Sequence, residues 1–410
     1  MTSDSVRMTA LELRASVSLA SLFALRMFGL FLILPVFAVH ARGLPGGDSA
    51  TLVGLALGVY GLAQALLHLP FGIASDRFGR KPVIVAGLVL FALGSFVAAS
   101  ADSVWGVVVG RAVQGAGAIS AAITAFIADS TRESQRTKAM AMVGGSIGLT
   151  FAVSLVAAPA LYAWIGMDGL FEATGVLALA AILLTVYVVP AAPKAAPFDG
   201  EPRGRTRLLD VALEPDLMRL NLGILVLHCV QMAMFVVVPR WLVERAGLPL
   251  AEHWKLYLGV LLLSFVAMLP ALFWGERRGH LRVVFLGAIA LLAAVALGLA
   301  AEPTGLVAMA GLLFAFFAGF NILEASLPSL VSRIAPPDAK GAALGIYNTT
   351  QALGLFAGGA LGGWLQSRWG GGAVFAMCAV LLVVWLAAAA GHRRWQAARG
   401  ARHQALDARS

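Results

Sequence analysis

Charged residues are scarce in this chain. Asp, Glu, Lys and Arg together make up only 12% of the 410 residues, whereas hydrophobic residues make up 60%. Soluble domains carry about 25% charged residues, so this composition excludes an ordinary soluble protein. Apolar runs of roughly 20 residues, the length that crosses a bilayer as a helix, follow one another along the chain. Stretches such as 83–99 do not alternate between polar and apolar residues, which excludes a β-barrel and predicts an all-α membrane protein.

Cysteine is also scarce. The two cysteines, Cys229 and Cys378, lie inside apolar runs and give no disulfide framework. The sequence contains no Walker loop and no His-Glu-x-x-His motif, so we expect no cofactor and no metal site. Residues 144–148 do spell G-x-S-x-G, but a serine-hydrolase elbow follows a strand, whereas this serine lies in an apolar helix where small residues serve packing. We therefore expect no enzymatic activity.

The net charge of +9 comes from basic residues spread over many loops. A nucleic-acid partner would need one basic patch, so we expect none. Most basic residues fall in the two terminal segments, the central segment and every second loop, and basic loops stay in the cytoplasm. We expect a multi-pass protein of a bacterial-type inner membrane, with both termini cytoplasmic and a basic tail near anionic lipid. The run 13–39 is too long for a signal peptide and contains Arg26, so it is expected to be the first span.

The apolar runs predict twelve transmembrane helices in two sets of six. We expect a six-helix bundle at 1–190, a cytoplasmic linker at 191–215, a second six-helix bundle at 216–395 and a basic cytoplasmic tail at 396–410. The linker is rich in Pro, Gly and Arg. Only short breaks separate the fifth span from the sixth and the eleventh from the twelfth, which are expected at 137–163, 169–189, 339–366 and 372–391. We expect the chain to act as a monomer.

The two halves share a short sequence repeat. Residues 70–79 and 270–279 carry Pro, an acidic residue, Arg and Gly at matching positions, and both segments follow the second span of their half. Repeats in corresponding positions of two bundles are typical of transporters that rock one half against the other around a central site. The repeat therefore favours two pseudo-symmetric bundles.

The strongest motif follows the second span. It consists of Gly72, Asp76, Arg77, Gly79, Arg80 and Lys81 with their spacing. This segment resembles motif A of the major facilitator superfamily, which implies a fold of two six-helix bundles and a transport function. An ordinary basic loop would account for the three cations but not for the spacing of the glycines and the aspartate.

Physical roles can be assigned within this motif. Gly72 lets helices approach closely, and Gly79 permits a tight turn. Asp76 can face the positive N-terminal end of a helix from the other half, which we expect to be the eleventh, starting near Ala339. The resemblance further implies that Arg80 pairs with Asp129 at the end of the fourth helix. These contacts are expected to gate the cytoplasmic side.

Residues 111–117 resemble motif B of the same superfamily. An arginine as deep as Arg111 costs about 2.5 to 3.5 kcal/mol to insert, so it should face a polar cavity or a partner. Gln114 shares its face, and Arg26 in the first span is a comparable anomaly. Alternatively, each arginine only holds helices together.

Further segments resemble the YajR branch of drug/proton transporters in this superfamily over most of the chain. They include 25–27, 110–112 and 323–325. The chain is expected to lack the additional C-terminal soluble domain of that branch. The antiporter signature, motif C, is poorly matched because Leu149 stands where a proline is usual. Export by antiport is therefore implied less firmly than the family.

Other polar residues recur at helical spacing inside the apolar runs. We expect them to line a substrate cavity: Tyr60, Gln64, His68, Gln114, His228, Gln231, Asn321, Asn348 and Gln351. The alternative is hydrogen bonding between helices, which contributes about 0.6 kcal/mol a pair.

Glu324 is the carboxylate placed well inside a predicted span, whereas Glu172 lies near the outer end of one. A carboxyl group removed from water can bind and release a proton near neutral pH. We expect Glu324 to carry a coupling proton, with Arg26 or Arg111 adjusting its proton affinity. A static ion pair with either arginine is the alternative.

Together these features favour proton-coupled export of a small amphipathic or drug-like compound by alternating access. Proton-coupled uptake by symport is the alternative within transport. A membrane sensor or scaffold without transport activity is the alternative from another class.

Overall fold

The computed structural model describes residues 8–191, 208–336 and 339–391, and these residues contain helices but no strand. The expected tail at 396–410 and most of the expected linker lie outside the described residues. The helices of the first half are α1 (Ala10–Leu32), α2 (Leu34–His40), α3 (Ala50–Phe78), α4 (Arg80–Ala99), α5 (Val104–Ala116), α6 (Ser120–Ser130) and α7 (Glu133–Leu183). The helices that follow the first half are α8 (Leu208–Ala212), α9 (Pro215–Glu244), α10 (His253–Arg277), α11 (Leu281–Ala300), α12 (Leu306–Ile334) and α13 (Lys340–Ala390).

Two of these helices are too long for one crossing. α7 and α13 each contain 51 residues, or about 77 Å at 1.5 Å per residue, more than twice a hydrocarbon core. Each bends at a glycine with a left-handed backbone, Gly166 (φ 69°) and Gly370 (φ 81°), which folds the helix into two spans. The described residues hold ten apolar stretches of sufficient length, two of which are these double spans. The prediction of twelve spans is therefore confirmed, and both bends fall in the predicted breaks.

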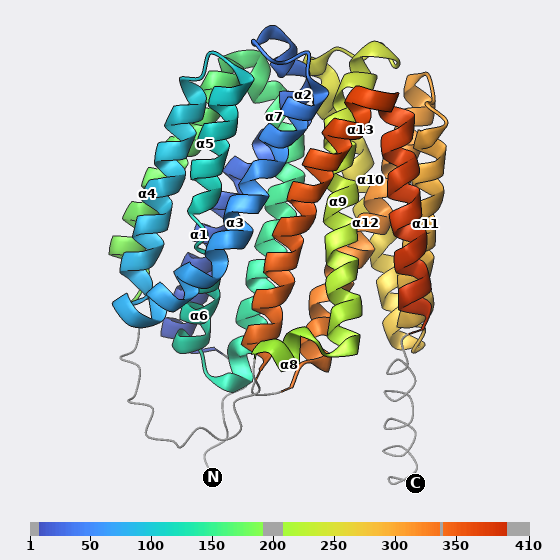
Figure 1. The fold of residues 1–410 in the computed structure, drawn as a ribbon. Coiled ribbons are helices and arrows are strands. Elements are labelled where there is room, and N and C mark those ends of the chain that lie inside the picture. Colours follow the sequence, from blue (N-terminus) through green and yellow to red (C-terminus); the bar gives the residue numbers. More distant parts are fainter. Residues whose placement is uncertain (1–7, 192–207, 337–338, 392–410) are drawn as a thin grey trace.

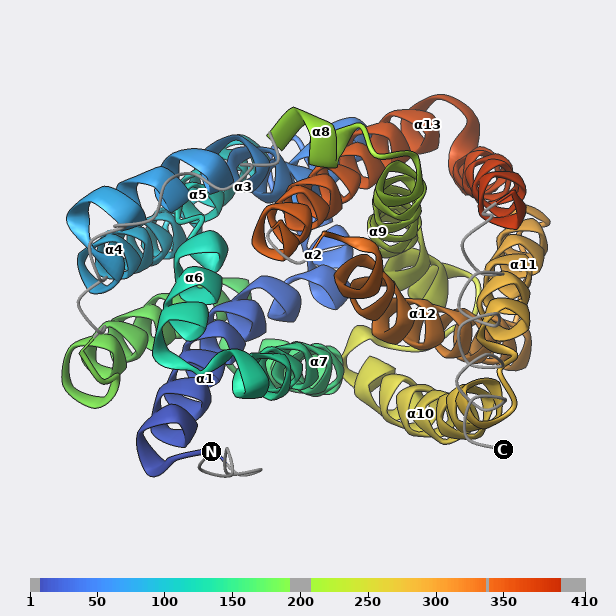
Figure 2. The same cartoon turned by 90° about the horizontal axis from the view of Figure 1, so that it is seen from below.

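The spans form two groups, α1–α7 and α9–α13 (Figure 1). Seen from below, the groups lie side by side, with α3 against α13 and α7 against α10 (Figure 2). Left-handed glycines recur in corresponding turns, Gly79 with Gly279 and Gly166 with Gly370. We call the end with Gly79 and Gly279 the motif end, and the end with Gly166 and Gly370 the far end. The short helix α8 lies in the segment expected to be the linker.

The two halves meet closely at the far end. A β-carbon on Gly54 of α3 would lie 2.2 Å from the carbonyl oxygen of Gly359 of α13. Small residues at this crossing therefore let the two backbones touch. Thr51 Oγ1 and Ser367 Oγ are 2.9 Å apart across the same crossing. An ion pair between Arg42, after α2, and Glu244, at the end of α9, also joins the halves there.

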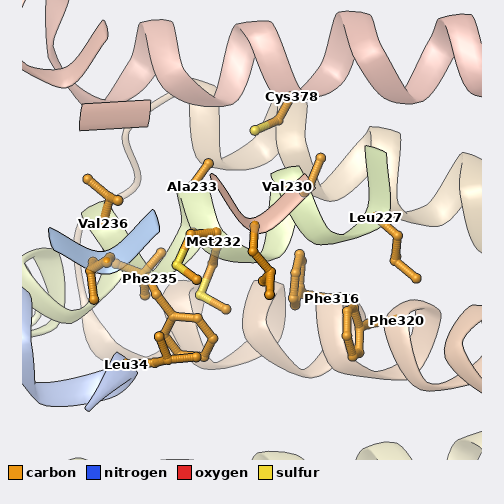
Figure 3. Packing of buried hydrophobic residues seen from close by; sticks show 14 of the residues in the cluster. Leu34, Leu227, Val230, Met232, Ala233, Phe235, Val236, Phe316, Phe320 and Cys378 are labelled. Carbon is orange, nitrogen blue, oxygen red and sulfur yellow. The ribbon is translucent and has the colours of Figure 1, made fainter. Parts of the chain in front are cut away.

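A shared apolar core continues between the halves toward mid-helix. Leu34 of α2 lies beside Phe235 of α9 in this core (Figure 3). The ring of Phe151 on α7 lies 5.9 Å from that of Phe320 on α12 and 6.4 Å from that of Phe235. Aromatic packing thus closes the boundary between the halves, next to the polar residues described below.

Candidate functional site

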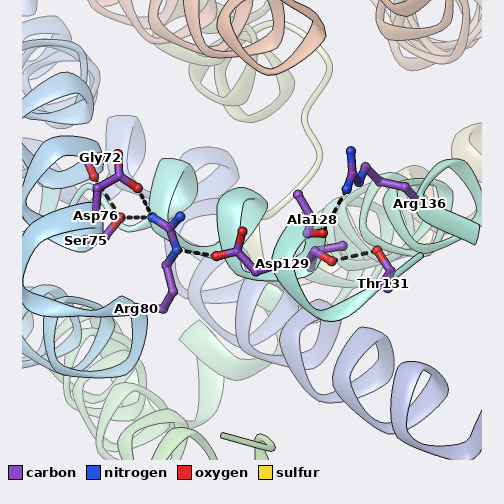
Figure 4. Close-up of polar contacts among 9 residues, drawn as sticks. Gly72, Ser75, Asp76, Arg80, Ala128, Asp129, Thr131 and Arg136 are labelled. Carbon is purple, nitrogen blue, oxygen red and sulfur yellow. Dashed lines mark hydrogen bonds and ion pairs between the residues drawn. The ribbon is translucent and has the colours of Figure 1, made fainter. Parts of the chain in front are cut away.

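The motif-end network is centred on Arg80, at the first position of α4 (Figure 4). Its Nε donates to Asp129 Oδ2 at 2.8 Å, which is the pair that the motif implied. Its Nη1 donates to Ser75 Oγ at 2.7 Å and to Asp76. Gly79, with φ 95°, provides the turn that brings the start of α4 back toward the end of α3. The network therefore ties three helices of the first half together.

Asp76 is bonded within its own half. In the described residues no hydrogen bond joins it to the first turn of α13, where the sequence placed its partner. Its side chain is 68% exposed. The remaining cations are also held locally: Arg77 lies 5.5 Å from the ring of Phe78, and Lys81 Nζ donates to the carbonyl of Val189 at 2.6 Å.

Gly72 does not mark a close helix contact here. A β-carbon on this residue would lie 3.6 Å from that of Ala121 on α6, which is ordinary contact. In this state the motif end is therefore organised inside the first half.

Two buried arginines lie near one tyrosine ring in the first half. The guanidinium carbons of Arg26 and Arg111 lie 5.6 and 4.9 Å from the ring centre of Tyr60, close enough for cation–π attraction. Arg26 Nη1 donates to Ser120 Oγ at 3.1 Å. The interruption between α5 and α6 places Ser120 at the start of α6, and Gln64 Nε2 approaches the same hydroxyl at 3.5 Å.

Arg111 begins a chain of hydrogen bonds inside the first half. Its Nη1 donates to Gln114 Oε1 at 3.0 Å, and Gln114 Nε2 donates to Ser95 Oγ at 2.8 Å. Arg111 and Arg26 are only 1% and 2% exposed. In the described chain neither contacts a carboxylate, so the structure does not contain the ion pair with Glu324 considered above.

The second half contributes a separate cluster around His228 of α9. Its Nε2 lies 2.7 Å from Gln351 Nε2 on α13, and its Nδ1 lies 3.2 Å from the carbonyl oxygen of Ile224. A carbonyl only accepts, so Nδ1 carries the hydrogen and Nε2 accepts from the Gln351 amide. This assignment makes the ring neutral. The ring of Phe320 packs beside it, with centroids 5.9 Å apart.

Glu324 joins this cluster. Its Oε2 lies 3.8 Å from His228 Nε2, and that oxygen is buried with no hydrogen-bond partner among the described residues. The side chain as a whole is 31% exposed, so the other part of the group is accessible. The expectation that Arg26 or Arg111 adjusts Glu324 gains no contact here, because its ionisable neighbours are His228 and Tyr347.

The other predicted cavity residues divide into two kinds. Asn321 Nδ2 donates to Ser264 Oγ of α10 at 3.0 Å, so Asn321, like Gln114, makes a bond between helices of one half. His68 Nδ1, by contrast, lies 3.4 Å from Thr349 Oγ1 on α13 and reaches across to the other half. Gln231 is buried and Asn348 is half-buried.

Several of the polar residues in these contacts were not identified from the sequence. They are Ser95, Ser120, Ser264, Tyr347 and Thr349. Hydroxyls within apolar helices carry little sequence signal, because Ser and Thr bond readily to their own helix and pack at helix contacts. Within the described ranges no three His, Cys, Asp or Glu side chains gather as metal ligands.

Comparisons with known proteins agree with this architecture. The profile of the Major Facilitator Superfamily matches residues 17–359 and 253–404. The chain is 42% identical to the inner membrane transport protein YajR of Escherichia coli (strain K12), over 93% of this chain and 84% of that protein. It is 28% identical to the multidrug resistance protein MdtH of Proteus mirabilis (strain HI4320), over 83% and 84% of the two chains.

Solved structures share the fold. A bacterial homolog of the human lysosomal transporter Spinster, in an inward-facing and occupied conformation, superposes with a TM-score of 0.71 at 14% identity, covering 93% of this chain and 97% of that one. The human organic anion transporter MFSD10 superposes with a TM-score of 0.69 at 19% identity, covering 93% and 100%. The chain therefore belongs to the major facilitator superfamily and is a transporter of that fold.

Proposed function

We propose that this transporter exports a small amphipathic or drug-like compound in exchange for protons by alternating access. The observation that carries the proposal is Glu324, a carboxylate within a membrane span whose Oε2 is buried without a partner. Proton coupling requires a group that is neutral in one state and charged in another. The names of the relatives, an inner membrane transport protein and a multidrug resistance protein, support the membrane and the substrate class.

The surroundings of Glu324 favour proton exchange over a fixed ion pair. His228 faces it from α9 and Tyr347 from α13, and Gln351 of α13 contacts His228. A buried carboxylate oxygen without a donor is costly as an anion, so a proton on Glu324 removes that cost. When the halves move and water or a donor reaches the group, the anion becomes tolerable and the proton can leave.

The distribution of small residues supports alternation between two states. At the far end, Gly54 and Gly359 are packed against the opposite backbone. Toward the motif end, Gly144 and Gly148 of α7 and Gly345 of α13 have no atom within 4 Å of a β-carbon position. In the alternative state, these glycines would close the motif end while the far end opens. Asp76, now exposed, would then meet the first turn of α13.

The basic residues of the terminal and central segments favour a cytoplasmic motif end in an inner membrane, with both termini on that side. The present state, closed at the far end, would then face the cytoplasm and be ready to load an exported compound. Reporter fusions at Gly200 and Ser410 test this topology. Both should behave as cytoplasmic, and a periplasmic signal from either would refute it.

A flux assay in proteoliposomes tests the function. Purified protein is reconstituted with an internal pH dye and challenged with a panel of amphipathic cations, neutral compounds and carboxylates, with a pH gradient of either sign. Antiport predicts that a compound moves against the direction of proton flow, and that an ionophore collapsing the gradient stops its accumulation. Movement in the same direction as protons would indicate symport. Absence of saturable flux for every compound would favour a sensor.

A further inference from the structure

We propose that Arg26, Tyr60 and Arg111 form a binding site for the acidic group of an organic anion, which makes a carboxylate-bearing amphipathic compound the substrate class. This proposal deepens the proposed transport function and rests on it. It arises because both arginines lie away from Glu324, so their charges need another explanation.

The same hydrogen-bond donors remain open on both arginines. Each guanidinium uses only Nη1, toward Ser120 in one case and Gln114 in the other. Nε and Nη2 of both side chains are buried and have no hydrogen-bond partner within the part of the chain that the structure describes. These two donors point in parallel from one edge of the planar group, and that edge binds the two oxygens of a carboxylate together.

The charge balance points to the same ligand. Arg26 and Arg111 are 2% and 1% exposed, and within the described residues their hydrogen bonds go to the neutral side chains of Ser120 and Gln114. The ring of Tyr60 stabilises two cations but neutralises neither. A buried charge without a counter-charge is strongly unfavourable. An anionic ligand would supply the counter-charge that the described side chains around the two arginines lack.

The Tyr60 hydroxyl adds a further open donor. It is buried and has no hydrogen-bond partner. Tyr60 and the two arginines therefore leave five donor atoms without a partner in the described residues, two nitrogens on each guanidinium and the phenol oxygen. Hydroxyl and guanidinium donors together suit an oxyanion and disfavour a cationic ligand.

The cluster is connected to the boundary between the halves. Arg26 and Gln64 both approach the hydroxyl of Ser120. His68, one turn along α3 from Gln64, contacts Thr349 of the other half. Movement of α3 against α13 would thus change the surroundings of the arginine cluster. The aromatic residues Phe151 and Phe320 pack together at the boundary between the halves, and movement of the halves would make them a surface for the apolar body of the ligand.

Equilibrium binding to the purified full-length protein tests the proposal without any transport step. The probes are naphthoate, its neutral analogue naphthamide and the cation naphthylmethylamine, which share one apolar body. Thermal stabilisation at pH 7 should saturate with naphthoate at a concentration at least about tenfold lower than with either analogue, because charge-assisted bonds are the stronger ones. Equal affinity for naphthoate and naphthamide would overturn the proposal.

Substitutions localise the site. Arg26→Gln and Arg111→Gln should each remove most of the preference for naphthoate, and Arg26→Lys should restore little, because lysine keeps the charge but lacks the two-donor edge. The matched control is Arg333→Gln, which removes an exposed arginine of α12 and should leave the preference unchanged. A preference that survives both Gln substitutions would refute the site.

Two further measurements separate this proposal from its alternatives. Removing an unpartnered buried charge should leave the melting temperature of the ligand-free protein unchanged or higher, whereas loss of a structural staple would lower it. Inorganic phosphate alone should stabilise far less than naphthoate, and equal stabilisation would reject an organic substrate. Glu324→Gln should keep the naphthoate preference, so failure of proton coupling and failure of this site are distinguishable.

Discussion

Oε2 of Glu324 lies 3.8 Å from Nε2 of His228, and the two side chains come from α12 and α9 of the same half. The distance is too long for a hydrogen bond. His228 Nε2 is instead engaged by Gln351. A small movement of α13 that withdraws Gln351 would free the ring to share a proton with Glu324, which connects helix motion to proton binding.

The first prediction concerns this carboxyl group. Glu324→Gln should abolish accumulation driven by a pH gradient but retain substrate binding and counterflow exchange, because an amide has the same shape and cannot carry the proton. Glu172→Gln, on an exposed face of α7, is the matched control and should accumulate normally. If the Glu324 variant still accumulates substrate, then His68 becomes the next position to test.

The second prediction concerns closure of the far end. Thr51→Cys combined with Ser367→Cys should form a disulfide under mild oxidation, because the native oxygens are 2.9 Å apart. Cross-linking should stop transport, and a reductant should restore it. Either single variant serves as the control and should remain active under oxidation. Full activity of the cross-linked protein would show that the far end does not need to open.

The third prediction uses this cross-link to follow the conformational equilibrium. Gly54→Ala should slow its formation, because a β-carbon would lie 2.2 Å from the Gly359 carbonyl oxygen and the helices must separate. Gly287→Ala, where nothing lies within 4 Å, provides a control of equal size. Equal cross-linking rates in the two variants would argue against tight packing at the crossing.

The fourth prediction concerns motif A. Asp76→Asn should speed the same cross-link, the opposite of the effect of Gly54→Ala. The expected reason is that Asp76 stabilises the state closed at the motif end, in which it meets the first turn of α13. Its loss would shift molecules toward the state closed at the far end. A slower cross-link would instead assign Asp76 to its present bond with Arg80.

The fifth prediction concerns Glu302 in the loop between α11 and α12. The Arg245 guanidinium, and then the backbone N–H of Gly372, hold the pKa of this carboxyl below its usual value. Stabilisation by the carboxylate is therefore present above the unfolded pKa of about 4.3 and is lost as pH falls through the lowered folded value. Glu302→Gln should destabilise the protein by about 1 kcal/mol or less at pH 7, since the pair is partly exposed.

The measurement for this fifth prediction is thermal unfolding of both proteins between neutral and acidic pH. The gap in melting temperature should narrow as the pH falls below the pKa of Glu302 in the folded protein. A gap that stays constant with pH would mean that the amide disturbs packing and that the charge is unimportant.

The sequence by itself determined the membrane class and the twelve spans, and its resemblance to motif A predicted the contact between Arg80 and Asp129. Span length and apolar composition decide whether a segment crosses a bilayer, and both are local properties. Gly166 and Gly370 fell in predicted breaks for the same reason. The Arg80–Asp129 contact could be predicted because members of the resembling family pair these two positions. The spacing of residues in this sequence alone does not indicate that pair.

Only the tertiary structure decided which polar residues meet. Helical periodicity assigns Glu324, Arg26 and Arg111 to inward faces, but it does not say which helix lies opposite each face. Packing placed Glu324 beside His228 and left both arginines around Tyr60. It also decided which end is closed, because the far-end seal depends on α3 and α13 approaching through Gly54 and Gly359, a relation between surfaces distant in sequence.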